Sequence, residues 1–270
     1  MCTVKHRANL MKTIHKYYLV GITLFYLMLP FGSIEAQNLE DEFDKRTYVG
    51  SSNISLRYRF HTPPNISDAN KIPLIVFLHG SGGWGQNNEA QLRGGNRHGL
   101  GLWLHDEIAS KHPAYILAPQ LSYQRWANPD SLLLAPHSQT LLELIAFLEN
   151  EYQIDEERIY LLGQSLGGAG VWDLVSKHPD RFAAAVPVCG FGNIELVERA
   201  REVPIWAFHG ELDTTVPVQR SRELVSLLRE LEGNIRYTEY SEVGHASWIR
   251  AFAEPELPNW LFSQSLDKNN

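Results

Sequence analysis

The sequence predicts an α/β protein built on a mostly parallel sheet with helices on both faces. Continuous apolar runs, such as 72–78 and 182–188, have the composition of strands that are buried on both sides. Segments with apolar residues at helical spacing, such as 132–152 and 218–231, alternate with these runs along the chain. A third observation is the hexapeptide GQSLGG at 163–168, which joins an apolar run to a helix-like run.

The first 36 residues have the layout of a cleavable signal peptide. A basic start precedes an apolar run at 17–29, and cleavage is expected between Ala36 and Gln37. A membrane span needs about 20 apolar residues, so a retained signal anchor is the less favoured alternative. We therefore expect a signal peptide at 1–36, a single catalytic domain at 37–270 and a secreted or periplasmic protein.

Charge and cysteine content restrict the partners of the exported domain. The first 36 residues carry four Lys or Arg and one Glu, so their removal would lower the formal net charge from −7 to −10. An acidic domain is not expected to bind nucleic acid, nor to insert stably into a membrane once the signal is removed. Cys189 would be its sole cysteine, which leaves no internal disulfide, and we expect it to be a small buried hydrophobe.

The N-terminal half of the domain predicts three strands and two helices. The acidic, polar stretch 37–46 is expected to be unstructured, and the glycine-rich segments 84–101 and 120–130 to be loops. The ordered elements are expected as a half-buried strand near the sheet edge at 54–60, a buried strand at 72–78, a helix at 102–111, a strand at 115–118 and a helix at 132–152.

The C-terminal half repeats the alternation of strands and helices. Its expected strands are at 158–162, 182–188, 205–208 and 235–240. Its expected helices are one that follows the GQSLGG motif and ends near 177, and three more at 194–201, 218–231 and 257–262. Only about 16 residues lie between the strands at 182–188 and 205–208. This leaves no room for a large lid domain, so we expect an open site.

Ser165 is the candidate nucleophile. It stands at the centre of G-x-S-x-G between a strand and a helix, where the turn is sharp and the serine backbone is strained. Small residues two positions before and after the serine keep side chains from colliding. The alternative is a glycine-rich helix N-terminus without chemistry.

A carboxylate and a histidine follow two later strands. Asp213 comes after the strand at 205–208, and His245 comes after the strand at 235–240. Functional groups in open α/β sheets gather beyond the carboxyl ends of the strands. The chain order Ser, Asp, His suits a serine nucleophile, a histidine base and a carboxylate that orients the imidazole. Glu211 is the alternative acid, and His79 and His209, each before a glycine, are expected to shape loops.

Two backbone amides are candidates for an oxyanion hole. Leu166 follows the serine, and Ser81 lies in the sequence HGSGG that follows the strand at 72–78. The histidines and carboxylates show no metal-ligand spacing, and no phosphate-binding lysine loop occurs. We therefore expect neither a metal nor a cofactor.

These motifs resemble the α/β-hydrolase superfamily, and within it the small esterases and predicted peptidases related to the phospholipase/carboxylesterase and dienelactone hydrolase families. The matching stretches are 73–83, 158–168, 179–190, 204–217 and 243–248. The resemblance implies the α/β-hydrolase fold and assigns Ser165, Asp213 and His245 to the triad, with the Ser81 and Leu166 amides as the oxyanion hole. Dienelactone hydrolases have a cysteine nucleophile, so the serine here argues against dienelactone chemistry.

Aromatic and amide side chains are candidates to contact the substrate. The loops 84–101 and 120–136 are expected to form the walls of the site, and aromatics beside amides suit a sugar face or an aromatic acyl group. The alternative for the tryptophans is that they hold their own loops in place. The candidate substrate contacts are Trp84, Asn87, Trp126, Gln164 and Trp248.

The sequence thus predicts a secreted serine hydrolase that cleaves carboxylic esters through an acyl-enzyme. Relatives with this layout imply small-molecule or polysaccharide esters, with acetyl or feruloyl groups as candidates. Two alternatives stay open. One is a serine peptidase of the prolyl-oligopeptidase type, and the other is a catalytically silent carbohydrate-binding domain.

Overall fold

The computed structural model describes residues 38–64, 66, 70–132 and 134–266. The predicted signal peptide at 1–36 lies outside these residues. None of the helices within the described ranges is long and apolar enough to cross a lipid bilayer.

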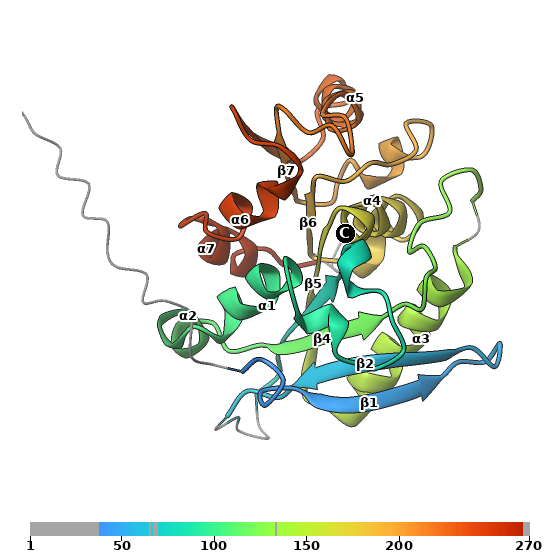
Figure 1. The fold of residues 1–270 in the computed structure, drawn as a ribbon, viewed down its shortest axis with the longest axis vertical. Helices are drawn as coiled ribbons and strands as arrows, with labels where there is room; N and C mark the ends of the chain where they lie inside the picture. The colour runs from blue at the N-terminus through green and yellow to red at the C-terminus, as the bar shows by residue number, and fades with distance from the viewer. Residues whose placement is uncertain (1–37, 65, 67–69, 133, 267–270) are drawn as a thin grey trace, which may run out of the picture. The chain divides into compact units, whose positions relative to one another are not determined.

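Across the described ranges, eight strands form one sheet in the order β1-β2-β4-β3-β5-β6-β7-β8 (Figure 1). The first two pairings, β1 with β2 and β2 with β4, are antiparallel, and all later pairings are parallel. The predicted mostly parallel sheet is therefore confirmed. The strands are β1 (Asp44–Val49), β2 (Ser55–His61), β3 (Ile72–Leu78), β4 (Tyr115–Gln120), β5 (Ile154–Gln164), β6 (Ala184–Val188), β7 (Ile205–Gly210) and β8 (Ile235–Tyr240).

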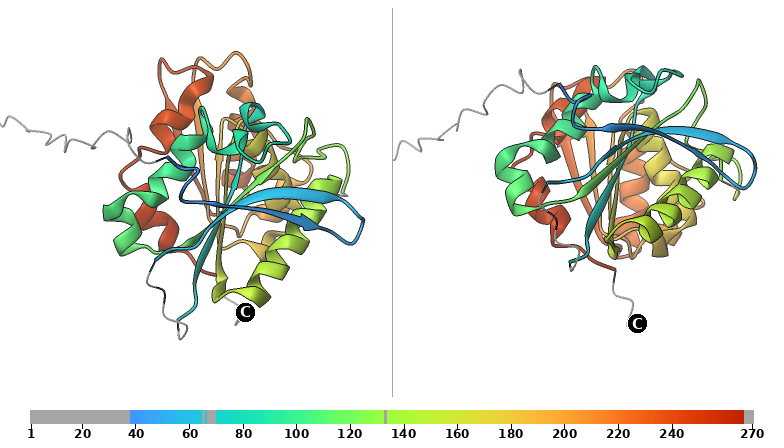
Figure 2. Two further views of the ribbon diagram at one scale, coloured as in Figure 1. Left: turned by 60° about the horizontal axis from the view of Figure 1, so that its bottom comes forward. Right: turned by 90° about the horizontal axis from the view of Figure 1, so that it is seen from below.

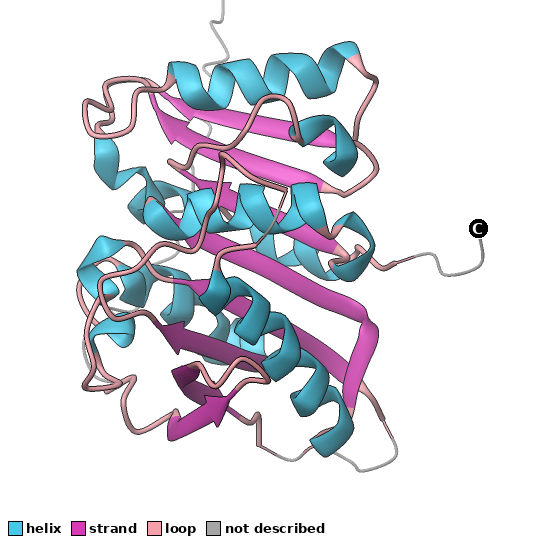
Figure 3. Cartoon of the chain, turned by 90° about the vertical axis from the view of Figure 1, so that its right-hand side faces the viewer, coloured by secondary structure: helices cyan, strands magenta, loops and turns pink. Residues whose placement is uncertain are grey.

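Helices cover both faces of this sheet. The α-helices are α1 (Asn96–Leu104), α2 (Asp106–Lys111), α3 (Pro136–Glu151), α4 (Leu166–Lys177), α5 (Gln219–Glu230), α6 (Trp248–Ala251) and α7 (Leu257–Phe262). Figure 2 shows α3, α4 and α5 on one side of the sheet, with α1, α6 and α7 on the other, and Figure 3 shows helices packed on the sheet. The buried strand β3 contacts helices on both faces of the sheet. Val76 packs with the first group of helices and Phe77 with the second.

Three expectations for the N-terminal half are wrong. Residues 44–46, expected to be unstructured with the rest of 37–46, instead begin the edge strand β1. They pair with β2, and every side chain of β1 is at least partly exposed. A polar composition is compatible with an edge strand because the strand gains its stability from backbone pairing with its neighbour.

The predicted loop 84–101 contains the short turn η2 (Ala90–Leu92) and the start of helix α1, and another short turn, η1 (Ser81–Gly83), lies just before it. Helix α1 packs so tightly that a Cβ on Gly99 would lie 2.1 Å from the ring of Phe77. Gly99, one of the glycines that made this stretch look like a loop, is required by that close packing. The helix expected at 102–111 is two helices, since His105 between them has extended dihedrals.

The connection between β6 and β7 confirms the absence of a large lid in the described chain. It contains the single 3₁₀ turn η4 (Val197–Ala200), which is shorter than the helix expected at 194–201. The closing helix α7 has the predicted bounds. The carboxyl ends of β5, β6, β7 and β8 are consequently left without a covering domain.

Candidate active site

The backbone of Ser165 is strained, as the motif predicts. The residue has φ 53° and ψ −114°, between the end of β5 and the first residue of α4. A left-handed φ is costly for a residue with a side chain and persists only where the surroundings enforce it. The turn is tight enough that a Cβ on Gly167 would lie 1.9 Å from the carbonyl oxygen of Leu78. The sharp turn presents Ser165 at the carboxyl edge of the sheet.

The structure brings the three predicted polar side chains together. The Nε2 atom of His245 lies 2.8 Å from Oγ of Ser165, and Nδ1 of His245 lies 2.7 Å from Oδ2 of Asp213. The Asp213 side chain is fully buried, whereas His245 is 22% exposed. Glu211, the alternative acid, is exposed and accepts from the amide of Glu242 instead.

The Asp213 carboxylate is held by its own loop. Its Oδ1 atom accepts from the backbone amides of Thr215 and Val216, both at 2.9 Å. Its other oxygen faces His245. The carboxylate is therefore fixed in an orientation that holds the imidazole with Nε2 toward Ser165.

The HGSGG loop passes beside Ser165. A Cβ built on Gly80 would lie 3.6 Å from Cβ of Ser165. The amide of Gly80 donates to Oδ1 of the buried Asn96 at 3.0 Å, which ties this loop to the start of α1. Among the described residues, no backbone carbonyl accepts from the amides of Ser81 or Leu166. Both amides therefore remain able to donate to a group bound at Ser165.

His79 anchors the same loop from inside the protein. Its Nδ1–H donates to the carbonyl of Gly80 at 2.6 Å, and its Nε2 accepts from the amide of Leu121 at 2.9 Å. Full burial lowers the pKa of His79 to about 4, so the ring is neutral at neutral pH. The expectation that His79 shapes a loop is confirmed.

Trp126 is wrongly predicted to contact substrate. Its side chain is fully buried and packs edge-on against His79, with ring centroids 5.5 Å apart. It also contacts helix α4, because a Cβ on Gly170 would lie 2.4 Å from Cβ of Trp126. The alternative reading, in which this tryptophan holds its own loop in place, is correct.

Trp84 and Asn87 also have structural contacts. The Nε1–H of Trp84 donates to the carbonyl of Gln124 at 2.9 Å, and its ring lies 5.9 Å from the exposed ring of Tyr123. The Oδ1 atom of Asn87 accepts from the amide of Glu89 at 3.0 Å and holds a turn. Both residues remain partly or fully exposed, so a role in substrate contact stays a prediction.

Gln164 and Trp248 lie against the start of α1. A Cβ on Gly95 would be 2.8 Å from Nε1 of Trp248 and 3.1 Å from Nε2 of Gln164. The Trp248 ring stands edge-on to His245, with centroids 5.3 Å apart. Gln164 is buried, and its Oε1 has no hydrogen-bond partner within the described chain. Asn96 was not among the predicted site residues, although it lies within 84–101, because a single polar residue carries no periodic signal.

Cys189 is buried, as expected, and it lies below the Asp213–His245 pair. Its sulfur and one ligand-type atom of each of the other two side chains lie within 4.8 Å of one another, a grouping that could hold a metal ion. Burial raises the pKa of the Cys189 thiol to about 12, however, and a protonated thiol is a poor ligand. Both imidazole nitrogens also have protein partners. We assign no metal to this group.

The mostly parallel sheet with helices on both faces, and the sharp turn at Ser165, are those of the α/β-hydrolase fold, and the proteins similar to this chain are hydrolases of that fold. Residues 131–258 match the family model described as the dienelactone hydrolase family. The chain is similar to the crystal structure of a thermostable esterase, with 36% identity and a TM-score of 0.80, over 83% of this chain and 63% of that one.

Two curated proteins are similar over shorter segments. The "Bifunctional acetylxylan esterase/xylanase XynS20E" of Neocallimastix patriciarum is 31% identical over 83 residues, covering 31% of this chain and 12% of that protein. An "Uncharacterized secreted protein" of Arthroderma benhamiae is 28% identical over 115 residues, covering 32% and 12%. The chain thus matches a small part of each curated relative and less than two thirds of the esterase.

Proposed function

We propose that this protein is a serine hydrolase that cleaves carboxylic esters through an acyl-enzyme intermediate. The observation that carries the proposal is the pair of contacts from His245 to Ser165 and to Asp213, at 2.8 and 2.7 Å. A serine hydroxyl needs an adjacent base to attack a carbonyl carbon, and this geometry supplies one. The similarity to a thermostable esterase supports ester hydrolysis as the reaction.

In this mechanism Ser165 attacks the ester carbonyl while His245 takes the hydroxyl proton on Nε2. The developing oxyanion accepts hydrogen bonds from the amides of Ser81 and Leu166. His245 then returns the proton to the leaving alcohol. Water hydrolyses the resulting acyl-enzyme by the same steps, with His245 again acting as the base. Asp213 keeps the Nδ1–H tautomer of His245 and stabilises the imidazolium.

Acetyl or feruloyl esters of polysaccharides are the proposed substrates. One curated relative carries acetylxylan esterase in its name, and the open site without a covering domain suits a chain-like substrate. The partly exposed ring of Trp84 and the 77% exposed Tyr123 lie on the loops near the HGSGG turn. Exposed aromatic rings of this kind stack on sugar faces or aryl groups.

We also propose that residues 1–36 are a signal peptide and that residues 37–270 act as a single exported catalytic domain. The basic start and short apolar run of the segment support this proposal. One relative is named as a secreted protein, which is consistent with export. Sequencing the N-terminus of the protein from the culture medium or periplasm tests it, and a terminus upstream of Gln37 would contradict cleavage after Ala36.

The decisive experiment compares the wild type with Ser165→Ala and with Ser226→Ala, an exposed serine on α5. We expect Ser165→Ala to lower turnover of p-nitrophenyl acetate by roughly three orders of magnitude or more, with an unchanged far-UV circular dichroism spectrum. Ser226→Ala should behave like the wild type. Activity retained in Ser165→Ala would remove this serine from the mechanism.

The same assay with p-nitrophenyl octanoate, methyl ferulate and a proline p-nitroanilide defines the reaction. Preference for the acetate or the ferulate supports the proposed esterase. Cleavage of the anilide alone would identify a peptidase, and no turnover of any of the four substrates would favour a binding domain.

A further inference from the structure

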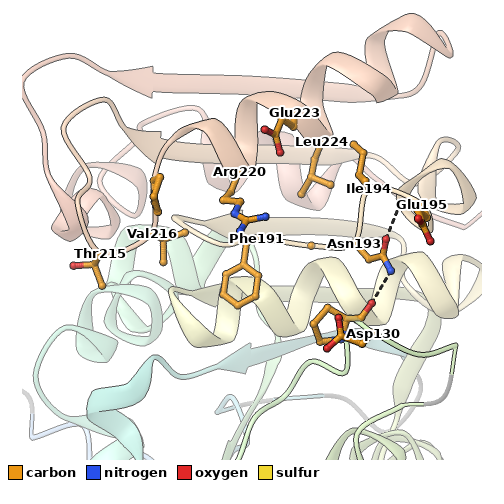
Figure 4. A pocket seen from close by; sticks show the side chains of 13 residues that line it. Asp130, Phe191, Asn193, Ile194, Glu195, Thr215, Val216, Arg220, Glu223 and Leu224 are labelled. Carbon is orange, nitrogen blue, oxygen red and sulfur yellow. Dashed lines mark hydrogen bonds between the residues drawn. The ribbon is translucent and has the colours of Figure 1, made fainter.

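The loop 211–218 between β7 and α5 carries Asp213 and is called the acid loop below. A cleft lies beside this loop, and no role has been assigned to it so far (Figure 4). Its volume is about 720 Å³, which is within the usual size of ligand sites. Three segments form its walls: the loop at 129–130, the loop at 191–195 that follows β6, and the segment 215–224 that includes the start of α5. Sequence reasoning placed the walls of the site on 84–101 and 120–136, so this cleft lies largely on other segments.

The cleft shares its walls with the proposed catalytic machinery. Thr215 and Val216 line it, and their amides are the donors that hold Asp213. Phe191 follows Gly190. Gly190 packs closely against helix α4, because a Cβ on Gly190 would lie 2.5 Å from the backbone of Gly168. A molecule bound in the cleft would therefore lie next to the two residues whose amides hold Asp213.

The wall at 191–195 is rigidly fixed to the loop at 129–130. The side-chain amide of Asn193 donates to the carbonyl of Pro129 at 2.6 Å, and its Oδ1 accepts from the amide of Glu195 at 2.7 Å. Both bonds are drawn in Figure 4. Gly192 packs on α4, since a Cβ there would lie 2.9 Å from Cβ of Trp172. A preformed wall of this kind lowers the entropy lost when a ligand binds.

The lining combines one aromatic ring with charged groups of both signs. Phe191 is half-buried, and Figure 4 shows Arg220 and Glu223 reaching toward the cleft from α5. Arg222, two residues further along the helix, forms an ion pair with Glu239. Within the described ranges, no ion pair engages Arg220, which lies in the first turn of α5, where the helix dipole disfavours a cation. This arginine has no evident structural purpose there.

The charge of the lining selects between neutral and acidic ligands. Asp130, Glu195 and Glu223 outnumber Arg220, so the cleft is net negative at neutral pH. Like charges repel an anionic ligand, whereas hydroxyl groups can both donate to the carboxylates and accept from the guanidinium. An aromatic ring beside such polar groups is suited to the face of a neutral pyranose.

We propose that this cleft binds neutral sugar units of the polysaccharide that carries the ester, with Phe191 as the stacking platform and Arg220 as a hydrogen-bond donor to sugar hydroxyls. This inference rests on the proposed esterase function and deepens it, because it locates the alcohol side of the substrate and excludes polyuronides. The acyl group would then point away from the cleft toward Ser165.

The test measures kcat/KM on acetylated xylotetraose and on p-nitrophenyl acetate for the wild type, Phe191→Ala and Arg220→Ala. Phe147→Ala on α3 and Arg229→Ala at the far end of α5 are matched controls at exposed positions. We expect Phe191→Ala and Arg220→Ala to lose roughly tenfold or more on the oligosaccharide and less than about twofold on p-nitrophenyl acetate. The controls should match the wild type on both substrates.

Binding of two probes without esters separates failure of this inference from failure of the proposed function. Titration calorimetry should detect xylotetraose binding that Phe191→Ala abolishes, and weaker or no binding of trigalacturonate. If Phe191→Ala matched the wild type both in kcat/KM and in xylotetraose binding, the proposed sugar site would be wrong. If the wild type bound trigalacturonate more tightly than xylotetraose, the assignment of a neutral sugar ligand would be wrong. A wild type that hydrolyses no ester but binds xylotetraose through Phe191 would reject the esterase and keep the sugar site.

Discussion

The Nε2 atom of His209 lies 3.2 Å from Oδ2 of Asp213, the same carboxylate oxygen that contacts Nδ1 of His245. His209 is fully buried at the end of β7, and its Nε2–H also donates to the carbonyl of Val216 at 2.9 Å. Its Nδ1 accepts from the hydroxyl of Ser221 at 2.7 Å. Burial lowers the pKa of His209, so the ring is neutral and its single N–H bridges both ends of the acid loop.

We infer from this bridge that His209 is a positioning residue for Asp213. We therefore expect His209→Ala to lower kcat for p-nitrophenyl acetate roughly tenfold with little change in KM. His209→Gln places an amide donor near the position of Nε2 and should restore most of the rate. A purely structural role would lower thermal stability in both variants without this rescue. Equal kcat in the wild type and His209→Ala would contradict the positioning role.

Asn96 should set the orientation of the proposed oxyanion donor in the HGSGG loop. Its Oδ1 accepts from the amide of Gly80, the residue before Ser81. Asn96→Ala removes this acceptor, and we expect kcat to fall roughly tenfold while KM changes less than about twofold, since the loss affects the transition state most. Asn150→Ala, an exposed position on α3, is the control. An Asn96→Ala variant with reduced stability but full kcat would show that the loop does not depend on this bond.

The fully buried ring of His79 should make the protein sensitive to mild acid. Its pKa falls from the usual 6.5 to about 4 in the folded state, so the unfolded chain binds the proton more tightly. The stabilising effect is complete above pH 6.5 and is lost as the pH falls toward 4. From this shift, the free energy of unfolding should fall by about 2 kcal/mol between pH 7 and pH 5 through this residue.

Urea unfolding of the wild type and His79→Gln at both pH values checks this expectation. The variant should be less stable at pH 7, because it loses the bonds to Gly80 and Leu121. Its stability should nevertheless depend less on pH than that of the wild type, since glutamine does not titrate. Other buried histidines act equally in both proteins and cancel from the difference. Parallel pH dependence in the two proteins would refute the assignment to His79.

The chemistry at the strand ends could be anticipated from sequence for a simple geometric reason. Neighbouring parallel strands end at the same edge of a sheet, so residues that directly follow β5, β7 and β8 must meet there. Ser165, Asp213 and His245 follow those strands, and their types suggested a common task before any distance was known. The glycines around Ser165 likewise report a tight turn that side chains would prevent.

Contacts between distant segments could not be anticipated in this way. The strand at Asp44–Val49 has no hydrophobic alternation to reveal it, because it gains its stability from backbone pairing at the sheet edge. Trp126 looks like an exposed loop aromatic, but its loop folds onto α4 and buries it. The bond from Gly80 to Asn96 joins the HGSGG loop to the first residue of α1, and their approach depends on the packing of α1 on the sheet. Each of these depends on tertiary packing rather than on local pattern.

The loop that carries Trp126 is also fixed by a buried ion pair at the end of α4. Nζ of Lys177 lies 2.7 Å from Oδ1 of Asp173, with 2% and 3% of the two side chains exposed, and it donates to the carbonyl of Asn128 at 2.8 Å. Lys177→Met leaves the carboxylate buried without its cation, so urea unfolding should show a loss of about 3 kcal/mol. The double variant Asp173→Leu with Lys177→Met should recover most of that loss, because no charge is then buried.

Lys177 can act through its ion pair with Asp173 or through its bond to the carbonyl of Asn128. The rate of trypsin cleavage after Arg125, an exposed residue in the same loop, distinguishes the two effects. Both variants lack the lysine that donates to Asn128, so both should be cleaved at Arg125 faster than the wild type, even though the double variant regains global stability. Lys177→Arg, which keeps a cation and donors, should be cleaved more slowly than either. If the double variant were protected like the wild type, the loop would not depend on the bond from Lys177, and Lys177 would act only through its charge.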